Sequence, residues 1–365
     1  MENIQLQHVL EVASHFDIAE QIADITEITT GHINRTYQLH TNTARSYILQ
    51  KVNTVIFKDS EGLMNNIHLV TDHLRRKLLS RGRDADREAL QLIPSKSGAV
   101  FHRSGDEVWR MYLTITGAKT YDRATSDEMF CEVGRAFGVF QRELADFDAA
   151  QLVETIPAFH DTVSRYAYFE EVVANDVVAR RSEVEEEIAF FMDRKCKAGF
   201  IVDGIREGTF PLRVTHNDTK LNNIMIDDET GKGICILDLD TVMPGSVLAD
   251  FGDAIRFGAS TAAEDETDLS LVNMDIDKFT AFAKGFVGGL EGSLTEAEVR
   301  ALPMGAYMMT LECGLRFLTD YLNGDTYFRI KHPKHNLDRA RNQMKLVRDM
   351  EIKMARMNEI IESFL

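Results

Sequence analysis

The sequence predicts an α+β protein with a small strand-rich N-terminal part and a larger, mostly helical C-terminal part. Two observations predict this class. Short apolar runs dominate residues 1–115, whereas segments with apolar residues at helical spacing dominate after Gly117. We therefore expect two parts, residues 1–116 and residues 117–365, that are joined by a short connection near 113–118.

Strand-like runs and two helical segments fill the N-terminal part. The helices are expected over residues 4–22 and near 60–80, the second because apolar residues recur there at helical spacing. A tight turn at Gly31 is expected between the first two strands. The expected strands lie at or near residues 25–29, 36–39, 46–50, 90–93 and 107–115.

The C-terminal part alternates helices with one compact insert. Ile224–Ile226 and Ile234–Leu237 are short apolar runs on either side of a turn-rich segment, which predicts a hairpin. Ser293 and Glu296 have the spacing of a helix capping box. The glycine-rich segment 285–292 follows a helix, so we interpret it as a helix terminus with a turn and not as a dinucleotide loop. The expected helices are residues 126–145, 165–200, 270–290, 295–322 and 336–364.

The overall charge excludes some classes of partner. The 365 residues include 41 Lys and Arg against 58 Asp and Glu, which gives a formal net charge of −17. This balance argues against nucleic acid or an anionic membrane as the main partner, although Mg²⁺ can bring a polyphosphate into an acidic site. The sequence has no uncharged apolar run of about 18 residues, no secretory signal pattern and no CxxC pair. We therefore expect a cytoplasmic protein.

The segment between His216 and Asp240 contains the residues that predict chemistry. Asp218 and Asn223 lie in a polar loop after a short strand, and Asp238 ends the second strand of the predicted hairpin. Asn223 and Asp238 offer oxygen ligands to Mg²⁺, while Asp218 is left to accept a proton, as phosphoryl transfer requires. Asp240 is two residues from Asp238 and faces the same side of an extended chain, so we include it in the metal site. The alternative interpretation is purely structural: a polar hairpin with a capping Asp and no catalytic role.

Asp250-Phe251-Gly252 spells the metal motif of protein kinases but does not fit its spacing. Asp250 lies 32 residues after Asp218, whereas Asp238 lies 20 residues after it. We therefore assign the metal to Asp238. Asp250 and Asp253 are expected to hold the loop beneath the site through backbone N–H groups and Arg256.

The whole chain resembles the aminoglycoside phosphotransferase/choline kinase family of small-molecule kinases. The His-x-Asp-x4-Asn motif with its later Asp identifies the wider group, and longer strings resemble a subgroup of sugar kinases. The matching strings are Gly31–Asn34, Thr36-Tyr37, Tyr47–Gln50, Phe159–Thr162, Arg213–Asn223, Leu237–Thr241, Met243–Ser246, Asp250–Asp253, Ile255–Ser260, Glu312–Gly314 and Arg316–Leu318.

The resemblance implies a bilobal protein-kinase-like fold with ATP between the lobes. It implies that Asp218 is the catalytic base, that Asn223 and Asp238 hold Mg²⁺, and that the product is the 1-phosphate of N-acetylglucosamine or N-acetylgalactosamine. An amino sugar is then the second substrate. The positions that match sugar contacts are His32, His216, Phe257, Arg316 and Tyr327.

The nucleotide side departs from the usual pattern. The turn at Gly31 has one glycine, although its backbone N–H groups can still bind phosphate. Either Gln50 or Lys51 occupies the position of the usual strand lysine, and the two face opposite sides of a strand. Backbone groups around Leu113 and Ile115 are expected to meet the adenine.

Several alternatives stay open from the sequence. Phe257 lies in an apolar run and fits a core position as well as a ligand contact. Arg316 can instead pair with Asp320, four residues later on a helix. The chain can also be a kinase of another small alcohol, such as an amino alcohol or aminoglycoside, or an inactive kinase-like binding protein.

Overall fold

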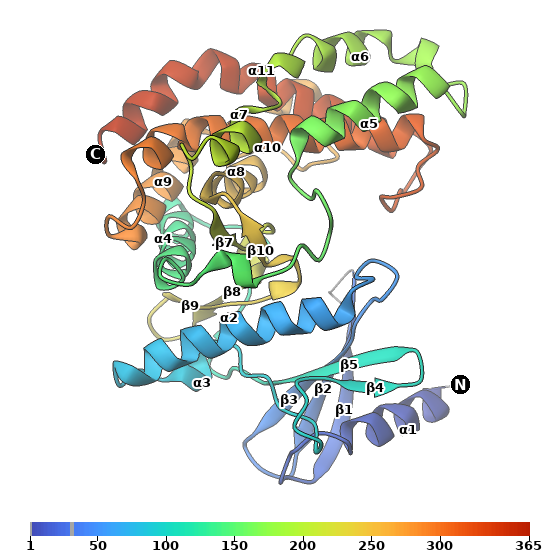
Figure 1. The fold of residues 1–365 in the computed structure, drawn as a ribbon, viewed down its shortest axis with the longest axis vertical. Coiled ribbons are helices and arrows are strands. Elements are labelled where there is room, and N and C mark those ends of the chain that lie inside the picture. Colours follow the sequence, from blue (N-terminus) through green and yellow to red (C-terminus); the bar gives the residue numbers. More distant parts are fainter. Residues whose placement is uncertain (1, 30–32) are drawn as a thin grey trace. The chain divides into compact units, whose positions relative to one another are not determined.

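A computed structural model describes residues 2–29 and 33–365 of the chain (Figure 1). The chain folds into two compact units. The N-terminal unit comprises Met1–Lys119, Ala149–Pro157 and Met225–Met243, and the C-terminal unit comprises Thr120–Asp148, Ala158–Ile224 and Pro244–Leu365. The predicted boundary near residue 116 lies close to the end of the first segment, but two later segments also belong to the N-terminal unit.

A five-stranded antiparallel sheet with the order β1-β2-β3-β5-β4 forms the centre of the N-terminal unit. Four of the five expected strands are confirmed, whereas residues 90–93 contribute only an isolated bridge between Leu92 and Tyr112. The strands are β1 (Ile22–Ile28), β2 (Arg35–Thr41), β3 (Ser46–Lys51), β4 (His102–Ser104) and β5 (Glu107–Leu113).

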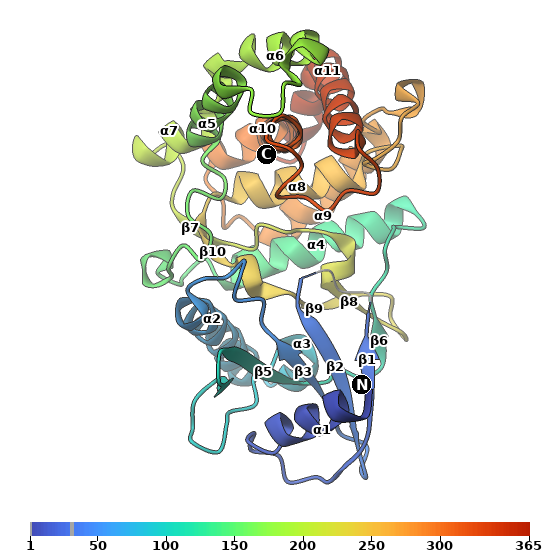
Figure 2. The same ribbon diagram turned by 90° about the vertical axis from the view of Figure 1, so that its right-hand side faces the viewer.

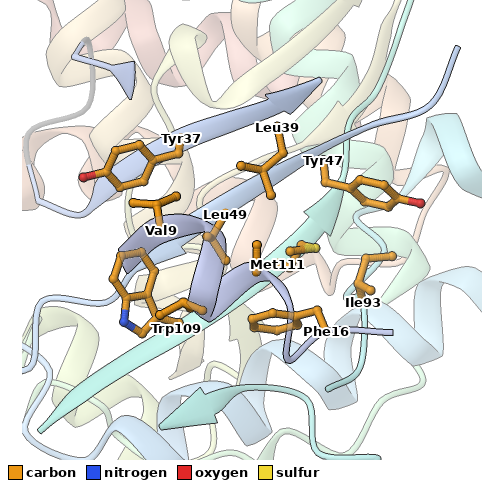
Figure 3. Packing of buried hydrophobic residues seen from close by; sticks show 11 residues of the cluster. Val9, Phe16, Tyr37, Leu39, Tyr47, Leu49, Ile93, Trp109 and Met111 are labelled. Atoms are coloured by element: carbon orange, nitrogen blue, oxygen red, sulfur yellow. The ribbon is translucent and has the colours of Figure 1, made fainter. Parts of the chain in front are cut away.

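One face of this sheet is covered by α1 (Glu2–Ala13), and together they enclose an apolar core (Figure 3). Leu49 pairs with Met111 across β3 and β5, and both side chains are fully buried. The expected helix over 4–22 ends early. The chain leaves the helix because Phe16 enters this core and forms a bridge with Ser95, a contact far away in sequence.

A long helix and a small second sheet complete the N-terminal unit. The helix α2 (Ser60–Ser80) matches the expected segment, and the side chain of Asp59 caps its first turn. The short helix α3 (Ala85–Glu88) follows it. The strands β6 (Ala118–Lys119), β8 (Ile224–Asp227) and β9 (Gly233–Ile236) form a three-stranded sheet, so the predicted hairpin is confirmed.

Helices dominate the C-terminal unit, as the sequence predicts (Figure 2). A two-stranded sheet of β7 (Arg213–Thr215) and β10 (Met243–Gly245) interrupts them. No helix of the described chain is long and apolar enough to span a bilayer. The helices are α4 (Asp127–Glu143), α5 (Thr162–Asn175), α6 (Glu185–Met192), α7 (Phe200–Arg206), α8 (Val247–Gly258), α9 (Ile276–Leu290), α10 (Glu296–Leu322) and α11 (His335–Glu362).

Two predictions about these helices are wrong in detail. The segment 165–200 is divided into separate helices because Asp176 adopts a left-handed conformation with φ of 40° and ends α5. The capping box of α10 involves Thr295 and Glu298 rather than Ser293 and Glu296. Asp250 lies in the first turn of α8.

Glycines let α4 and α9 approach each other closely. A Cβ atom on Gly285 would lie 1.8 Å from the backbone oxygen of Cys131, and one on Gly134 would lie 2.3 Å from the backbone oxygen of Phe282. The glycine-rich segment therefore belongs mainly to a helix interface. Its last two residues, Glu291 and Gly292, form the expected turn, with φ of 46° and 78°.

Candidate active site

The carboxylate of Asp250 holds the polar loop that follows β7. The backbone N–H groups of His216 and Asn217 donate to its two oxygens at 2.9 and 2.7 Å, and Gln141 donates a third hydrogen bond at 2.6 Å. Asp250 is buried, and this burial raises the pKa of its carboxyl group. The prediction that Asp250 fixes the loop through backbone N–H groups is confirmed. Asn217 has a strained φ of 64°, as loop residues at functional sites often do.

Asp218 receives donors from two sides within this loop. The Nδ2 atom of Asn223 lies 3.1 Å from Oδ2 of Asp218 and 2.9 Å from its backbone oxygen. The Nζ atom of Lys220 lies 2.5 Å from Oδ1. The carboxylate remains partly exposed. A fixed, partly exposed carboxylate of this kind is able to orient a hydroxyl group and take its proton.

Lys220 lies in the same loop, and the sequence alone gives it no role. Burial alone would lower the pKa of Lys220, but the carboxylates of Asp218 and Asp253 outweigh burial and raise this pKa. The position of Lys220 two residues after Asp218 is the sequence feature that could have indicated this contact. Lys220 therefore places a stable positive charge beside the predicted base.

Asp253 and Arg256 form a buried ion pair one turn apart on α8. Nη2 of Arg256 lies 2.8 Å from Oδ1 of Asp253, and Nη1 donates to Glu264 at 2.6 Å. Burial opposes ionisation of Asp253, but Arg256 and Lys220 outweigh it and hold its pKa below the ordinary value. The expected contact between Asp253 and Arg256 is confirmed.

Asn223 and Asp238 fit a hard cation by their chemistry. Nδ2 of Asn223 is used by Asp218, which leaves the amide oxygen as the atom that can bind a metal. Asp238 adopts a left-handed conformation with φ of 53° and ψ of 61°, an unusual backbone for a residue with a carboxylate. Within residues 2–29 and 33–365, no three His, Cys, Asp or Glu side chains form a ready metal cluster.

Asp240, which the sequence places in the predicted metal site, is engaged by other side chains in the structure. Leu239–Thr241 forms a turn of 3-10 helix, so Asp238 and Asp240 do not share the face of an extended strand. Arg110, which is 1% exposed, forms a buried ion pair with one oxygen of Asp240. Nδ2 of Asn34 donates to the other oxygen at 2.6 Å. Protein donors therefore engage both oxygens, and we do not propose Asp240 as a metal ligand.

Neither residue at the position of the usual strand lysine is a free cation. Nε of Arg110 donates to Oε1 of Gln50 at 2.9 Å, while Nε2 of Gln50 donates to Thr36 at 3.1 Å. Lys51 forms an ion pair with Glu107. Both Gln50 and Lys51 therefore have protein partners, and the contact of either with a phosphate stays a prediction.

The other predicted nucleotide positions are described only in part. Gly31 and His32 lie outside the described residues. The backbone N–H of Leu113 donates to the carbonyl oxygen of Gln91 at 3.0 Å, and Ile115 is buried. Their predicted contact with adenine stays a prediction.

His216, which the resemblance predicts to contact the substrate, lies buried in the structure. Its side chain is 0% exposed, and its ring packs edge-on against Phe137 and Phe140 at centroid distances of 5.7 and 6.0 Å. The backbone N–H of Asp218 donates to Nδ1 of His216 at 3.3 Å. His216 therefore supports the loop from within the core. Phe257, by contrast, is 40% exposed at the end of α8.

Arg316 and Tyr327 line a cavity of about 180 Å³ on the C-terminal unit. Nη2 of Arg316 lies 3.5 Å from the hydroxyl oxygen of Tyr327, which is 63% exposed. The alternative pairing of Arg316 with Asp320 is wrong. Asp320 instead accepts hydrogen bonds from the backbone N–H groups of residues 326, 327 and 328 and from Asn336, and so fixes the segment that carries Tyr327.

Arg165 contributes a second guanidinium to this cavity. Its Nη2 donates to the carbonyl oxygen of Phe159, whereas its buried Nε has no partner in the described structure. Burial and the neighbouring charge of Arg316 lower the pKa of Arg165. No local sequence pattern points to Arg165, because its neighbour in space lies 151 residues later.

The carboxylate of Glu312, which lies beside Arg316, is hydrogen-bonded to neighbouring side chains. It accepts from His160 at 2.8 Å and from Thr162 at 2.6 Å. Burial opposes its ionisation, but His160 and Arg316 outweigh burial and lower the pKa of Glu312. Glu312 is therefore ionised, and its carboxylate oxygens are bound to protein donors and not available to a ligand.

Comparison with known proteins identifies the family. A sequence model of the phosphotransferase enzyme family, which includes the aminoglycoside phosphotransferases, matches residues 24–281. This chain belongs to that family. It is therefore a small-molecule kinase, an enzyme that transfers phosphate to an alcohol group, and the expectation of an enzyme is confirmed.

Solved structures confirm the kinase-like fold. A choline kinase from Cryptosporidium parvum is 12% identical, with a TM-score of 0.60 over 98% of this chain and 99% of that one. An aminoglycoside phosphotransferase from Alicyclobacillus acidocaldarius is 13% identical, with a TM-score of 0.59 over 97% and 96% of the two chains. A spectinomycin phosphotransferase in complex with ADP and spectinomycin is 15% identical, with a TM-score of 0.55 over 97% and 98%.

Proposed function

We propose that this enzyme is an N-acetylhexosamine 1-kinase. In this proposal it uses ATP and Mg²⁺ to phosphorylate the anomeric C1 hydroxyl of N-acetylglucosamine or N-acetylgalactosamine. The resemblance of the sequence to such kinases motivates the choice of substrate. The lining of the cavity around Arg316 supports this choice over a cationic substrate.

The main observation in favour of a neutral sugar over a cationic alcohol is the positive charge of that cavity. Arg165 and Arg316 both line it, and neither has a carboxylate within ion-pair distance among residues 2–29 and 33–365. Its one acid, Asp320, already accepts three backbone hydrogen bonds and one from Asn336. An amino alcohol or aminoglycoside would meet two positive charges there, whereas a neutral sugar would meet donors for its oxygens.

Aromatic side chains add a surface that suits a sugar. Tyr168, Tyr327 and Phe328 line the same cavity. The guanidinium carbon of Arg316 lies 5.7 Å from the ring centre of Tyr327 and 5.5 Å from that of Phe328. Aromatic rings pack against the apolar face of a sugar, and the guanidinium donates to its hydroxyl or amide oxygens.

The catalytic loop supplies the remaining groups of the proposed reaction. Asp218 orients the C1 hydroxyl and takes its proton as the new bond to phosphorus forms. Lys220 places a positive charge beside this carboxylate, 2.5 Å from Oδ1. Asn223 and Asp238 would hold Mg²⁺, which when bound neutralises phosphate charge. ATP leaves as ADP.

A coupled assay of ADP release tests the proposal. The panel contains N-acetylglucosamine, N-acetylgalactosamine, glucose, galactose, choline, ethanolamine, an aminoglycoside and the 1-O-methyl glycoside of N-acetylglucosamine. We expect turnover with the two acetamido sugars and none with the glycoside, whose C1 oxygen is blocked. Preferred turnover of a cationic alcohol would contradict the substrate assignment, and phosphorylation of the glycoside would contradict C1 as the acceptor.

A further inference from the structure

A second cavity, of about 320 Å³, opens beside the catalytic loop of the C-terminal unit. Its walls come from the loop at 122–124, residues 219–221, the end of α8 with the segment to residue 265, α9 and α11. The helices α8, α9 and α11 belong to the same packed group in this unit (Figure 2). Its size falls within the usual range for small-ligand sites.

Positive charge dominates the wall of this cavity, although the whole chain has a net charge of −17. The wall has three acids. Glu264 pairs with Arg256 at 2.6 Å, Asp265 pairs with Lys331 at 2.7 Å, and Asp122 is exposed. In the described chain no carboxylate lies within ion-pair distance of Arg123 or Lys278. The five cationic residues of the wall are Arg123, Lys220, Arg256, Lys278 and Arg339.

Two buried polar atoms of the wall have no hydrogen-bond partner in the described structure. Gln343 is 2% exposed, and its Nε2 donates to Asn342 at 3.1 Å while its Oε1 is unpartnered. The Nε of Arg339 makes no hydrogen bond, and the nearest carboxylate oxygen, on Glu264, is 4.0 Å away. Buried polar groups are nearly always paired in folded proteins. An acceptor and a donor are therefore available to a ligand.

We propose that this cavity is a binding site for a phosphate ester that carries hydroxyl groups. Lys278, Arg123 and Arg339 would hold the phosphate, since guanidinium and ammonium groups bind such oxyanions. A hydroxyl of the same ligand would donate to Oε1 of Gln343. A neutral sugar would satisfy Gln343 but leave the excess positive charge uncompensated.

Lys220 connects this site to catalysis. It lines the cavity and also lies 2.5 Å from the carboxylate of Asp218. An anion in the cavity competes with Asp218 for this ammonium group. If the proposed function holds, the sugar phosphate product belongs to the ligand class of the cavity, so product accumulation slows turnover from a site other than the acceptor pocket.

Isothermal titration calorimetry on the nucleotide-free full chain at low ionic strength tests the site. The probes are N-acetylglucosamine 1-phosphate, inorganic phosphate and neutral N-acetylglucosamine. The variants are Lys278→Met, Arg123→Ser and Gln343→Met. Lys284→Met is the matched control, because Lys284 is exposed on the same helix α9 and lies outside the cavity.

We expect the sugar phosphate to bind wild type and Lys284→Met equally, with Kd raised about tenfold or more in Lys278→Met and Gln343→Met. Arg123→Ser and Lys278→Met alter side chains that are not buried, so they keep the test valid if Gln343→Met fails to fold.

Absence of binding, or binding that all variants retain, overturns the site. Equal affinity for inorganic phosphate overturns the ester assignment, and displacement by the neutral sugar shows that the cavity is the acceptor pocket instead. The measurement involves no turnover, so failure of the substrate screen leaves its result intact.

Discussion

The Nζ atom of Lys220 lies 2.5 Å from Oδ1 of Asp218, while Asn223 donates to Oδ2 of the same carboxylate. The loop therefore fixes both oxygens of Asp218 through side chains within five residues of it. In the N-terminal unit Lys51 is paired with Glu107 and Gln50 is neutral. Lys220 thus places a positive charge on the loop itself, directly beside the predicted base.

Lys220→Met should lower kcat by about 10²-fold, because an aligned positive charge is lost where negative charge moves during transfer. Lys220→Arg keeps the charge and should retain most of the activity. Steady-state kinetics with saturating ATP and acceptor measure both. Equal losses in the two variants would indicate that the shape of the lysine matters and not its charge.

Asp218→Asn should keep the fold and lower kcat by about 10²–10⁴-fold, the usual loss when a general base is removed. The amide preserves the shape but cannot accept the proton. Thermal melting should match wild type. Asp106→Asn changes an exposed Asp outside the loop and should leave kcat unchanged. Near-normal turnover in Asp218→Asn would remove Asp218 as the base.

Local patterns made part of the site predictable. Asp218 and Asn223 lie five residues apart in one loop, and the structure brings them into contact. The pairing of Asp240 was not predictable, because it depends on Arg110, which lies 130 residues earlier in the chain. The burial of His216 was not predictable either, because Phe137 and Phe140, which pack against its ring, lie more than 70 residues earlier in the chain.

The fold, too, was predictable only where its determinants are local in the sequence. The helix at 60–80 was predictable because its apolar spacing and its Asp59 cap are both local. The early end of α1 was not, because it depends on the bridge between Phe16 and Ser95. The packing role of Gly285 was not predictable either, since the oxygen that excludes a side chain there belongs to Cys131 on another helix.

Gly285→Ala should lower the free energy of unfolding by roughly 1–3 kcal/mol, the usual range for an overpacked interface. The new Cβ would lie 1.8 Å from the backbone oxygen of Cys131, so α4 and α9 must separate. Gly288→Ala is the matched control on the same helix, because nothing lies within 4 Å of its Cβ. It should raise stability by up to about 1 kcal/mol through helix propensity. Denaturant unfolding measures both, and a stabilising Gly285→Ala would refute the close packing.

Glu107→Gln should remove a pH-dependent part of the stability of the N-terminal unit. Burial opposes ionisation of Glu107, but hydrogen bonds from Lys51, His8 and Trp109 outweigh it and lower its pKa to about 2 from 4.5. Because the folded pKa is depressed, the stabilisation is present above about pH 4.5 and is lost as the pH falls toward 2. Wild type should therefore lose stability over this range, and the variant should lose less.

Trp109 is the single tryptophan of the chain and donates to Glu107 at 3.0 Å. Its fluorescence during urea unfolding at several pH values therefore follows this unit. A constant difference in stability between wild type and Glu107→Gln across that range would contradict the depressed pKa.

Arg316→Ala should raise KM for the acceptor sugar much more than KM for ATP. Arg316 lines the proposed acceptor cavity with Arg165 and has aromatic rings on several sides, so its loss would remove donors to the oxygens of a bound sugar. A buried donor or acceptor left unpaired costs about 1–3 kcal/mol, which corresponds to roughly 5- to 150-fold in KM. Arg300→Ala is the matched control, because Arg300 is exposed near the start of the same helix α10.

The outcome for each substrate separates the possible roles of Arg316. An equal rise in both KM values would point to a general loss of structure, which a lowered melting temperature would reveal. A rise for ATP alone would place Arg316 at the nucleotide. If Arg316→Ala instead improved the use of choline or an aminoglycoside over N-acetylglucosamine, the positive charge of this cavity would be shown to exclude cationic acceptors, and the selectivity of the enzyme would rest on that repulsion.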